Sequence, residues 1–397
     1  MTERIRIGLV GAGFASRFHF EGYGRVYKIP VEVVGINDIH PEARESFARN
    51  HHIKSFPTLE ELCEASDVID ICTPAATHAE LAFKALELGK HVVVEKPFTG
   101  YYGPPKEQGG DFRGDAFPKD IMLREAIANC DRVLAAARKS KKTICYAENW
   151  IYAPAMQKER EILTKTGGQI LWMVGDESHS GSHSPFYGDW KYSGGGSLMG
   201  KGCHPLSSAI HLKRVEGETR RGKPIRPARV SAHMHEITRL SSFRDEGFLR
   251  KDYKDSEDYS QVHVTFQDGT VADVFASELV LGGVRNWINV YANNHMTRCQ
   301  ISPIDAVDTY NPREELLKDV FVTEKIGTKQ GWSHPSPDED WQHGYPHEFQ
   351  DFVESISQGR QPLSDAALAR DTVAALYSAY LSSERHGSDV EVPLTEN

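Results

Sequence analysis

The 397-residue sequence has no excess of basic residues and no long apolar run. Asp and Glu together number 56 against 46 Lys and Arg, which gives a net charge of −10. Nucleic-acid binders and polybasic membrane-surface proteins carry a basic excess, so the balance argues against both classes. No run of 18 apolar residues is present, so we expect no membrane span. We therefore expect neither a nucleic-acid nor a membrane partner.

Paired cysteines are also absent. The six cysteines are scattered without a Cys-x-x-Cys pair: Cys63, Cys72, Cys130, Cys145, Cys203 and Cys299. Structural zinc requires such spacing, so we expect no metal site. The first residues run from a short apolar stretch directly into a glycine-rich turn, without the pattern of a secretory signal. These features predict reduced thiols and a cytoplasmic protein.

The first 148 residues alternate strand-like runs with helical patterns. The strand-like runs are Ile5–Val10, Val31–Ile36, Val68–Cys72, His91–Glu95 and Thr143–Ala147. Strict alternation predicts a doubly wound α/β domain, with a parallel sheet and helices on both faces. The segment Gly100–Lys119 has five glycines and three prolines, so it fits neither element. Such long loops are often functional, and we expect this one as an insertion in domain 1–148.

After Asn149 the strand-like runs lie closer together and often alternate apolar with polar residues. They are Ile170–Val174, Val230–His235, Gln261–Phe266, Val271–Ser277 and Trp287–Tyr291. Helical patterns fall mainly at Ala153–Thr164 and near the C-terminal end. This pattern predicts a second, α+β domain over residues 149–397, with an open and mostly antiparallel sheet.

A glycine-rich turn, Gly11-Ala12-Gly13-Phe14-Ala15-Ser16, follows the first strand. Glycine permits a tight turn and lets a pyrophosphate approach the helix N-terminus. Ser16 replaces the third glycine, which weakens the motif, but its place on the first βα turn strengthens it. We expect a dinucleotide to contact Gly11, Gly13, Phe14 and Ala15. The alternative is a glycine turn without a ligand.

Asp38 ends the second strand, where it can accept hydrogen bonds from ribose hydroxyls and repel a 2′-phosphate. This position predicts NAD rather than NADP as the cofactor. The alternative for Asp38 is an exposed cap before Pro41.

Glu95-Lys96-Pro97, preceded by Gly89-Lys90-His91, resembles a motif of the glucose–fructose oxidoreductase/inositol dehydrogenase/MocA (Gfo/Idh/MocA) family of NAD-dependent oxidoreductases. Thr73-Pro74 and Thr77-His78 upstream, and the glycine-rich turn Gly194–His204 downstream, match the same family. The resemblance extends from Ile5 to the C-terminal helices. It implies an N-terminal Rossmann domain and a C-terminal domain for substrate binding and oligomerisation. The C-terminal helices would pack back on the first domain, and the protein would be a homodimer or homotetramer.

The resemblance also implies roles for individual residues. Lys96 would lie near the reacting hydroxyl, and His204 matches the catalytic histidine of the family. The implied cofactor contacts are Thr73, Pro74, His78, Glu95, Lys96 and Asn149. One departure is important: the family commonly has Asp four residues before the histidine, whereas this chain has Gly200. The missing carboxylate puts the standard proton relay in doubt.

Oxidation of a secondary alcohol requires a base for the hydroxyl proton and an acceptor for the hydride. Imidazole titrates near working pH, and burial beside a nicotinamide cation would lower the pKa of a lysine. We expect His204 to take the proton and Lys96 to polarise the same oxygen. The reverse assignment stays open, since two coupled groups share one titration.

Several polar and aromatic residues could line a sugar site. The candidates are Tyr152, His179, His183, Trp190, Lys201, Arg285 and Trp287. Tryptophan stacks on sugar faces, although it is as often simply packed in the core. His179 and His183 could instead bind a metal, but Gly, Ser and Pro around them favour a loop that contacts substrate.

Three functions stay open. The first is NAD-dependent oxidation of a sugar, cyclitol or glycoside. The second is an NAD-dependent glycosidase, as some members of the family are: it would oxidise C3, eliminate the C1 group, add water and return the hydride. There, Lys201 and Arg285 would receive an anionic substituent. The third is an NAD-binding regulator without catalysis.

Overall fold

The computed structural model describes residues 4–105, 111–182, 184–302 and 306–395. Its N-terminal part contains a six-stranded, all-parallel sheet in the order β3-β2-β1-β4-β5-β6. The strands are β1 (Ile5–Val10), β2 (Val31–Asn37), β3 (Lys54–Ser55), β4 (Val68–Ile71), β5 (His91–Glu95) and β6 (Ile144–Ala147). β4 and β6 are buried throughout, as expected for parallel strands covered on both faces. The predicted Rossmann domain is confirmed.

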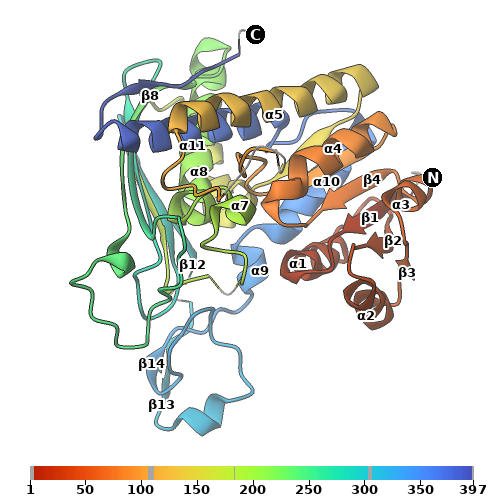
Figure 1. Cartoon of the computed structure of the whole chain (residues 1–397), viewed down its shortest axis with the longest axis horizontal. Coiled ribbons are helices and arrows are strands. Elements are labelled where there is room, and N and C mark those ends of the chain that lie inside the picture. Colours follow the sequence, from red (N-terminus) through yellow and green to blue (C-terminus); the bar gives the residue numbers. More distant parts are fainter. Residues whose placement is uncertain (1–3, 106–110, 183, 303–305, 396–397) are drawn as a thin grey trace.

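Five helices flank this sheet (Figure 1). They are α1 (Phe14–Tyr23), α2 (Pro41–His51), α3 (Leu59–Ala65), α4 (His78–Glu87) and α5 (Lys119–Ser140), with a 3-10 turn η1 (Ala75–Thr77) before α4. Local signals explain where two of them begin. Pro41 occupies the first turn of α2, and the Thr58 side chain accepts a hydrogen bond from the Glu61 N–H before α3.

The second sheet has seven strands in the order β12-β11-β7-β10-β9-β8-β15. The strands are β7 (Ile170–Ser178), β8 (Pro227–His235), β9 (Tyr259–Phe266), β10 (Val271–Ser277), β11 (Arg285–Ala292), β12 (Met296–Ser302) and β15 (Val390–Glu391). Only β7 and β10 pair in parallel among these neighbours; the other pairs are antiparallel. This confirms the predicted open, mostly antiparallel sheet.

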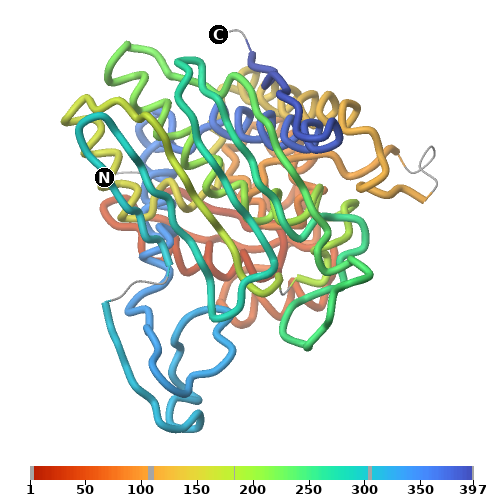
Figure 2. The backbone as a smooth tube through the Cα atoms, turned by 90° about the vertical axis from the view of Figure 1, so that its left-hand side faces the viewer, coloured from red at the N-terminus to blue at the C-terminus, as the bar shows by residue number. Residues whose placement is uncertain are grey.

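Helices cover one face of the second sheet and leave the other open. The covering helices are α6 (Pro154–Thr166), α8 (Cys203–Arg221) and α11 (Ala366–Glu384). Figure 2 shows the green and cyan strands in front, with no helix over them. We call these the inner and outer faces of the sheet. Strand alternation sends Gly175 and Glu177 to the inner face and Asp176 and Ser178 to the outer face.

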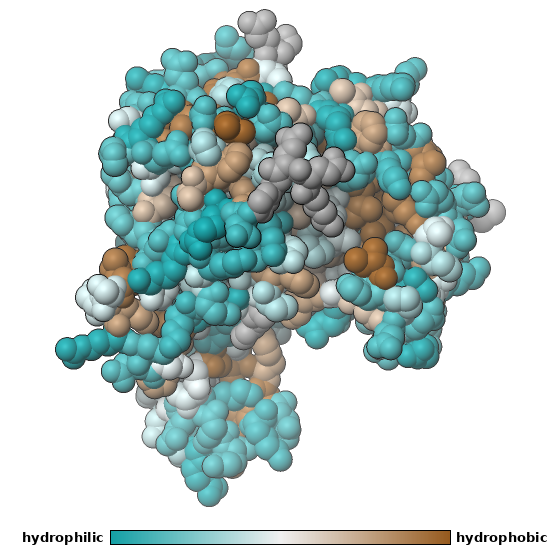
Figure 3. All heavy atoms as spheres, viewed as in Figure 1, coloured by the Kyte–Doolittle hydropathy of each residue, from teal (hydrophilic) through white to brown (hydrophobic). Residues whose placement is uncertain are grey.

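The remaining elements lie outside the two large sheets, and β13 and β14 among them form a separate two-stranded sheet. They are η2 (Asn149–Tyr152), α7 (Trp190–Ser193), the π-helical turn η3 (Leu198–Gly202), η4 (Ile237–Arg239), β13 (Thr309–Asn311), η5 (Glu314–Leu317), β14 (Gly331–Ser333), α9 (Glu339–Gln342) and α10 (Tyr345–Gln358). α10 packs against α1, and α11 packs against α5. Hydrophilic residues cover most of the face in Figure 3, while hydrophobic residues gather where the domains meet. None of the described helices is long and apolar enough to cross a membrane.

The described part of the loop 100–119 forms hydrogen bonds with the second domain. The Tyr101 N–H donates to the Tyr377 hydroxyl at 2.7 Å, and the Gly114 N–H donates to Asp255 at 2.7 Å. Trp190 lies between them, only 2% exposed, and its indole N–H donates to the Tyr101 carbonyl at 3.0 Å. Trp190 is therefore packed between the domains with its indole N–H already bonded, and its predicted contact with substrate stays a prediction.

Candidate active site

The glycine-rich turn leaves space at the N-terminus of α1. Gly11 has a positive φ of 98°, and an added Cβ there would lie 3.0 Å from the Cys72 carbonyl oxygen. At Gly13, which precedes α1, an added Cβ would meet nothing within 4 Å. Phe14 is 66% exposed, and Ala15 follows it in the first turn. The first N–H groups of α1 therefore face open space that suits a pyrophosphate.

Asp38 lies beside this turn. Its carboxylate accepts hydrogen bonds from the Ala12 N–H and the His40 N–H, both at 2.7 Å. The carboxylate is thereby fixed at the end of β2, next to the glycine turn. This arrangement fits the dinucleotide predicted from the sequence.

The other predicted cofactor residues lie at neighbouring strand ends. His78 Nε2 lies 2.8 Å from the Thr73 carbonyl oxygen, and its Nδ1 lies 2.9 Å from the Pro97 carbonyl oxygen. Thr73-Pro74 follows β4, so His78 joins the turns after β4 and β5. Asn149, after β6, donates to the His343 carbonyl at 2.9 Å. His78 and Asn149 thus position backbone around the carboxyl edge of the sheet, where ligands of doubly wound folds bind.

Glu95 is held by a buried cluster. His19 Nε2 lies 3.1 Å from Glu95, and its Nδ1 lies 2.8 Å from Asp70. Burial lowers the pKa of His19, but Asp70 and Cys72 outweigh it and raise the pKa well above the ordinary value. The resulting imidazolium fixes the Glu95 carboxylate directly before Lys96. Glu95 is therefore held in place by His19, and its predicted contact with the cofactor stays a prediction.

Lys96 and His204 interact with the same two carboxylates, those of Glu148 and Glu177. Lys96, after β5, donates to the Gly200 carbonyl at 3.0 Å, and His204 lies in the first turn of α8. Burial opposes the charged ammonium, but Cys203 and three glutamates around it raise the pKa of Lys96 above its ordinary value. The glutamates are Glu95, Glu177 and Glu148. The expected lowering of this pKa is not seen, so Lys96 stays charged and its ammonium donates hydrogen bonds.

Glu148 holds His204. It follows β6, and its Oε1 lies 2.5 Å from His204 Nδ1. Trp150 stacks on the imidazole, with ring centroids 5.6 Å apart. Since a carboxylate only accepts, His204 donates from Nδ1 and presents the Nε2 lone pair on its other side. Glu148 thus gives His204 a carboxylate partner, although the position four residues before it is Gly200.

Tyr187 explains the glycine at position 200. An added Cβ at Gly200 would lie 1.3 Å from the Tyr187 hydroxyl oxygen. That hydroxyl donates to the Gly196 carbonyl at 2.7 Å, and the ring packs against the Lys201 ammonium. An aspartate at position 200 and Tyr187 cannot occupy this space together.

Replacing Gly200 with alanine is expected to destabilise the protein by about 1–3 kcal/mol, the usual cost of overpacking a core. Adding Tyr187→Ser should recover part of that loss, because the serine vacates the space that the new methyl needs. Thermal unfolding measures both. Gly327→Ala is the control, since its Cβ meets nothing within 4 Å and its φ is not left-handed. Equal melting temperatures for Gly200→Ala and the control would contradict this packing.

A buried carboxylate holds the turn that leads to His204. Glu257 accepts hydrogen bonds from the Gly196 and Leu198 N–H groups, at 3.0 and 2.9 Å, and from the Tyr380 hydroxyl at 2.8 Å. Burial nevertheless raises the pKa of Glu257 to about 7. An added Cβ at Gly196 would lie 1.9 Å from the Glu257 carbonyl oxygen, so this close approach requires glycine.

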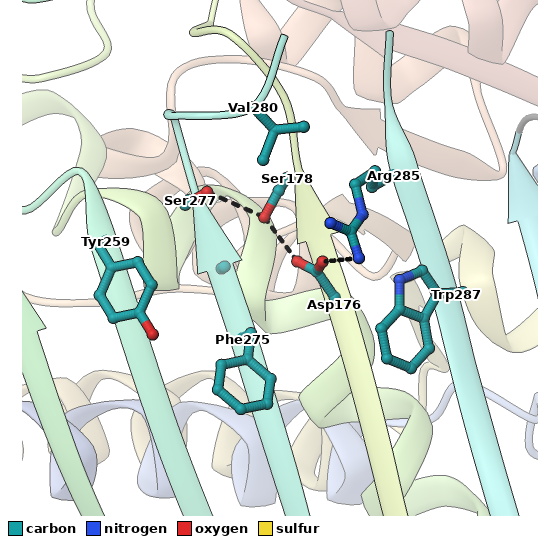
Figure 4. Close-up of a pocket in the computed structure, with 9 residues that line it drawn as sticks. Asp176, Ser178, Tyr259, Phe275, Ser277, Val280, Arg285 and Trp287 are labelled. Atoms are coloured by element: carbon teal, nitrogen blue, oxygen red, sulfur yellow. Dashed lines mark hydrogen bonds and ion pairs between the residues drawn. The ribbon is translucent and has the colours of Figure 1, made fainter. Parts of the chain in front are cut away.

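The predicted substrate residues scatter. Arg285 and Trp287 lie on the outer face, beside a cavity of about 310 Å³, and Arg285 pairs with Asp176 at 3.3 Å (Figure 4). Tyr152 is buried and donates to Asp351 at 2.9 Å. The described contacts of Arg285 and Tyr152 are not with His204, and the predicted contact of all three residues with substrate stays a prediction. His183 lies outside the described residues.

Lys201 and His179 lie closer to His204. Lys201 is buried and pairs with Glu278, and His179 Nδ1 lies 3.8 Å from the same glutamate. The charge of Lys201 is thus already compensated. Because Arg285 is on the other face of the sheet, the two cations cannot receive one anionic substituent together.

Two buried groups have metal-ligand chemistry among the described residues: His19, Asp70 and Cys72, and Glu148, Cys203 and His204. In each, the histidine is hydrogen-bonded to its carboxylate. The ammonium of Lys96 adjoins the second group and opposes a cation there.

Residues 5–104 match the model of an oxidoreductase family with an NAD-binding Rossmann fold. UDP-N-acetylglucosamine 3-dehydrogenase of Acidithiobacillus ferrooxidans is 32% identical over 95 residues, which cover 24% of this chain and 29% of that protein. Glucose-6-phosphate 3-dehydrogenase of Bacillus subtilis is 37% identical over 94 residues, which cover 24% of this chain and 26% of that protein. The chain thus spans less than a third of the length of these curated relatives.

The fold as a whole resembles a solved structure. The crystal structure of GenD2 from gentamicin A biosynthesis, in complex with NAD, matches with a TM-score of 0.78 at 23% identity. The match covers 99% of this chain and 97% of that chain. Together with the family match, it identifies the N-terminal domain as an NAD-binding Rossmann domain.

Proposed function

Because residues 5–104 belong to the Gfo/Idh/MocA family of NAD-binding oxidoreductases, we propose that the chain is an NAD-dependent carbohydrate oxidoreductase. It would transfer hydride from a secondary ring hydroxyl of a sugar, cyclitol or glycoside to NAD. The observation that carries the proposal is that Lys96 and His204 share the buried carboxylates of Glu148 and Glu177, beside the carboxyl edge of the Rossmann sheet.

The proposed mechanism assigns one task to each side chain. The Lys96 ammonium donates a hydrogen bond to the reacting oxygen, and His204 Nε2 accepts the hydroxyl proton. Glu148 keeps the imidazole in the required tautomer and stabilises its cation. NAD supplies the hydride acceptor. Gly11, Gly13, the start of α1 and Asp38 would hold it.

We place the oxidised hydroxyl at C3 of a pyranose ring, since both named relatives are 3-dehydrogenases. The test incubates the protein with NAD and a panel of polyols, sugars and methyl glycosides. NADH absorbance and proton NMR of the product follow the reaction. A 3-keto glycoside is expected; a panel without any NADH formation contradicts the proposal.

Replacing Asp38 with serine is expected to raise the KM for NAD by roughly 10–100-fold, because a hydrogen bond to a charged acceptor is lost. The same change should lower the KM for NADP, since it removes the charge that repels a 2′-phosphate. Steady-state kinetics with both dinucleotides measure the two effects. Unchanged selectivity for NAD would show that Asp38 does not face the ribose.

A second candidate is an NAD-dependent glycoside hydrolase with transient C3 oxidation. Elimination next to a ketone needs a further base, and buried Glu177 supplies a carboxylate beyond the Glu148–His204 pair. In deuterated water this reaction releases a sugar labelled at C2 without accumulating NADH.

We also propose a homo-oligomer that assembles through the outer face of the second sheet. That face carries no helix in Figure 2 and displays Trp172 stacked on Tyr291. A cytoplasmic location suits the six free cysteines. Light scattering after size exclusion determines the oligomeric state.

A further inference from the structure

Glu177 lies beside His204 and has one buried carboxylate oxygen without a hydrogen-bond partner among the described residues. It lies on the inner face of β7, next to the last residue of the strand, and its side chain is 11% exposed. Its Oε2 lies 3.8 Å from His204 Nε2. That oxygen is buried and has no hydrogen-bond partner among the described residues. The flanking Asp176 and Ser178 face the other way and bond to each other at 2.6 Å (Figure 4). Nε2 is the side of the imidazole that Glu148 leaves open.

The cations near Glu177 have other partners. Lys201 pairs with Glu278, and Lys96 donates to the Gly200 carbonyl. Burial raises the pKa of Glu177 even though His204 and the two lysines act to lower it. A buried carboxylate without a hydrogen bond is costly, so a bound molecule that donates one is favoured here.

Asn286 adds a second acceptor at the same place. It is the cross-strand partner of Glu177 on β11, it is buried, and its Oδ1 has no partner among the described residues. Two acceptors on one face call for a ligand rich in donors. Hydroxyl and ammonium groups satisfy them, whereas a carboxylate or sulfonate would be repelled.

We propose that Glu177 accepts a hydrogen bond from the substituent on the ring carbon next to the one oxidised. This inference rests on the proposed oxidation at His204. A hydroxyl bonded to His204 Nε2 brings the neighbouring substituent of the ring toward the adjacent Glu177 Oε2. The site therefore selects a vicinal diol or a vicinal amino alcohol. It discriminates against a deoxy carbon or an anionic group at that position.

The test compares Glu177→Gln with the wild type on a set of probes. The probes are methyl β-D-glucoside and its 2-deoxy, 4-deoxy and 2-amino-2-deoxy analogues. With the wild type, removal of the recognised hydroxyl should lower kcat/KM by roughly 10–100-fold, the range for a hydrogen bond to a charged group. Glu177→Gln should lower kcat/KM for the glucoside by a similar factor while leaving that deoxy analogue nearly unchanged. The ratio of kcat/KM between the glucoside and that deoxy analogue should therefore fall toward one in Glu177→Gln.

Asp176→Asn is the matched control. It removes the same charge one residue away, on the outer face, and should keep the wild-type discrimination. Saturation-transfer NMR of the same four probes with NAD-loaded protein provides a readout that does not need turnover. It should show the same loss of selective binding in Glu177→Gln.

Three results would overturn the inference. They are discrimination retained by Glu177→Gln, an equal loss on all four probes, and deuterium incorporation at C2 that disappears in Glu177→Gln while discrimination persists. The last would assign Glu177 to proton abstraction from carbon. A wild type that binds the probes selectively but forms no NADH would contradict the proposed oxidation and leave the recognition by Glu177 supported. A wild type that binds none of them contradicts both.

Discussion

Replacing His204 with asparagine is expected to lower kcat by about 10²–10⁴-fold, the contribution of a positioned general base. Asparagine keeps a polar side chain at the start of α8 but cannot take a proton from the substrate hydroxyl. Binding of NAD should be unchanged, since the glycine turn and Asp38 lie in the other domain. Rapid-mixing kinetics of NADH formation, with NAD affinity measured by calorimetry, test both parts.

The partner of His204 makes this prediction specific. Glu148→Gln should also lower kcat strongly, because an amide neither fixes the tautomer nor stabilises the imidazolium. The double variant His204→Asn/Glu148→Gln should be no slower than His204→Asn alone, since residues that act as one unit are not additive. If the two losses multiply, Glu148 acts independently of His204, and the proposed pair is wrong.

Replacing Lys96 with methionine is expected to lower kcat by roughly 10²–10³-fold, as for loss of one donor to a developing charge. Methionine keeps most of the apolar length and removes the ammonium. Lys96→Arg should restore little, because the guanidinium is broader and Lys96 also donates to the Gly200 carbonyl. Circular dichroism of the variants controls for folding.

The pH dependence separates the two residues. Since the pKa of Lys96 is raised, this lysine stays charged across the neutral range. It loses its proton only when the pH rises above the ordinary pKa of a lysine. The acid limb of kcat should therefore disappear with His204→Asn and persist, at a lower level, in Lys96→Met. An acid limb that vanishes with Lys96→Met would reverse the assignment of base and donor.

The fold could be predicted because its signals are local. Alternating strands and helices between Ile5 and Ala147 define a parallel sheet, and the Glu95-Lys96-Pro97 motif marks the end of one strand. The pairing of Glu148 with His204 could not be predicted. The two residues are 56 positions apart and meet only through the packing of η2 and α8. An acid at the carboxyl end of a parallel strand was the one available signal.

The scatter of the predicted substrate residues over the structure has physical causes. Arg285 and Trp287 alternate with Asn286 on β11, and a shift of one residue in a strand exchanges the faces of a sheet. Tyr152 and Trp190 resemble sugar-binding aromatics in composition, but both are buried with their polar atoms already bonded. The interpretation of Lys201 as an anion receptor overlooked Glu278, which lies 77 residues away in the sequence.

The most direct test of the central claim follows methyl β-D-glucoside with NAD in deuterated water by proton NMR, alongside NADH absorbance. We expect a 3-keto glucoside and NADH to form in equal amounts, and much less of both to form with His204→Asn. Glucose released with deuterium at C2 and without NADH would contradict net oxidation and establish the hydrolase. NAD binding without turnover of the whole substrate panel would contradict catalysis altogether.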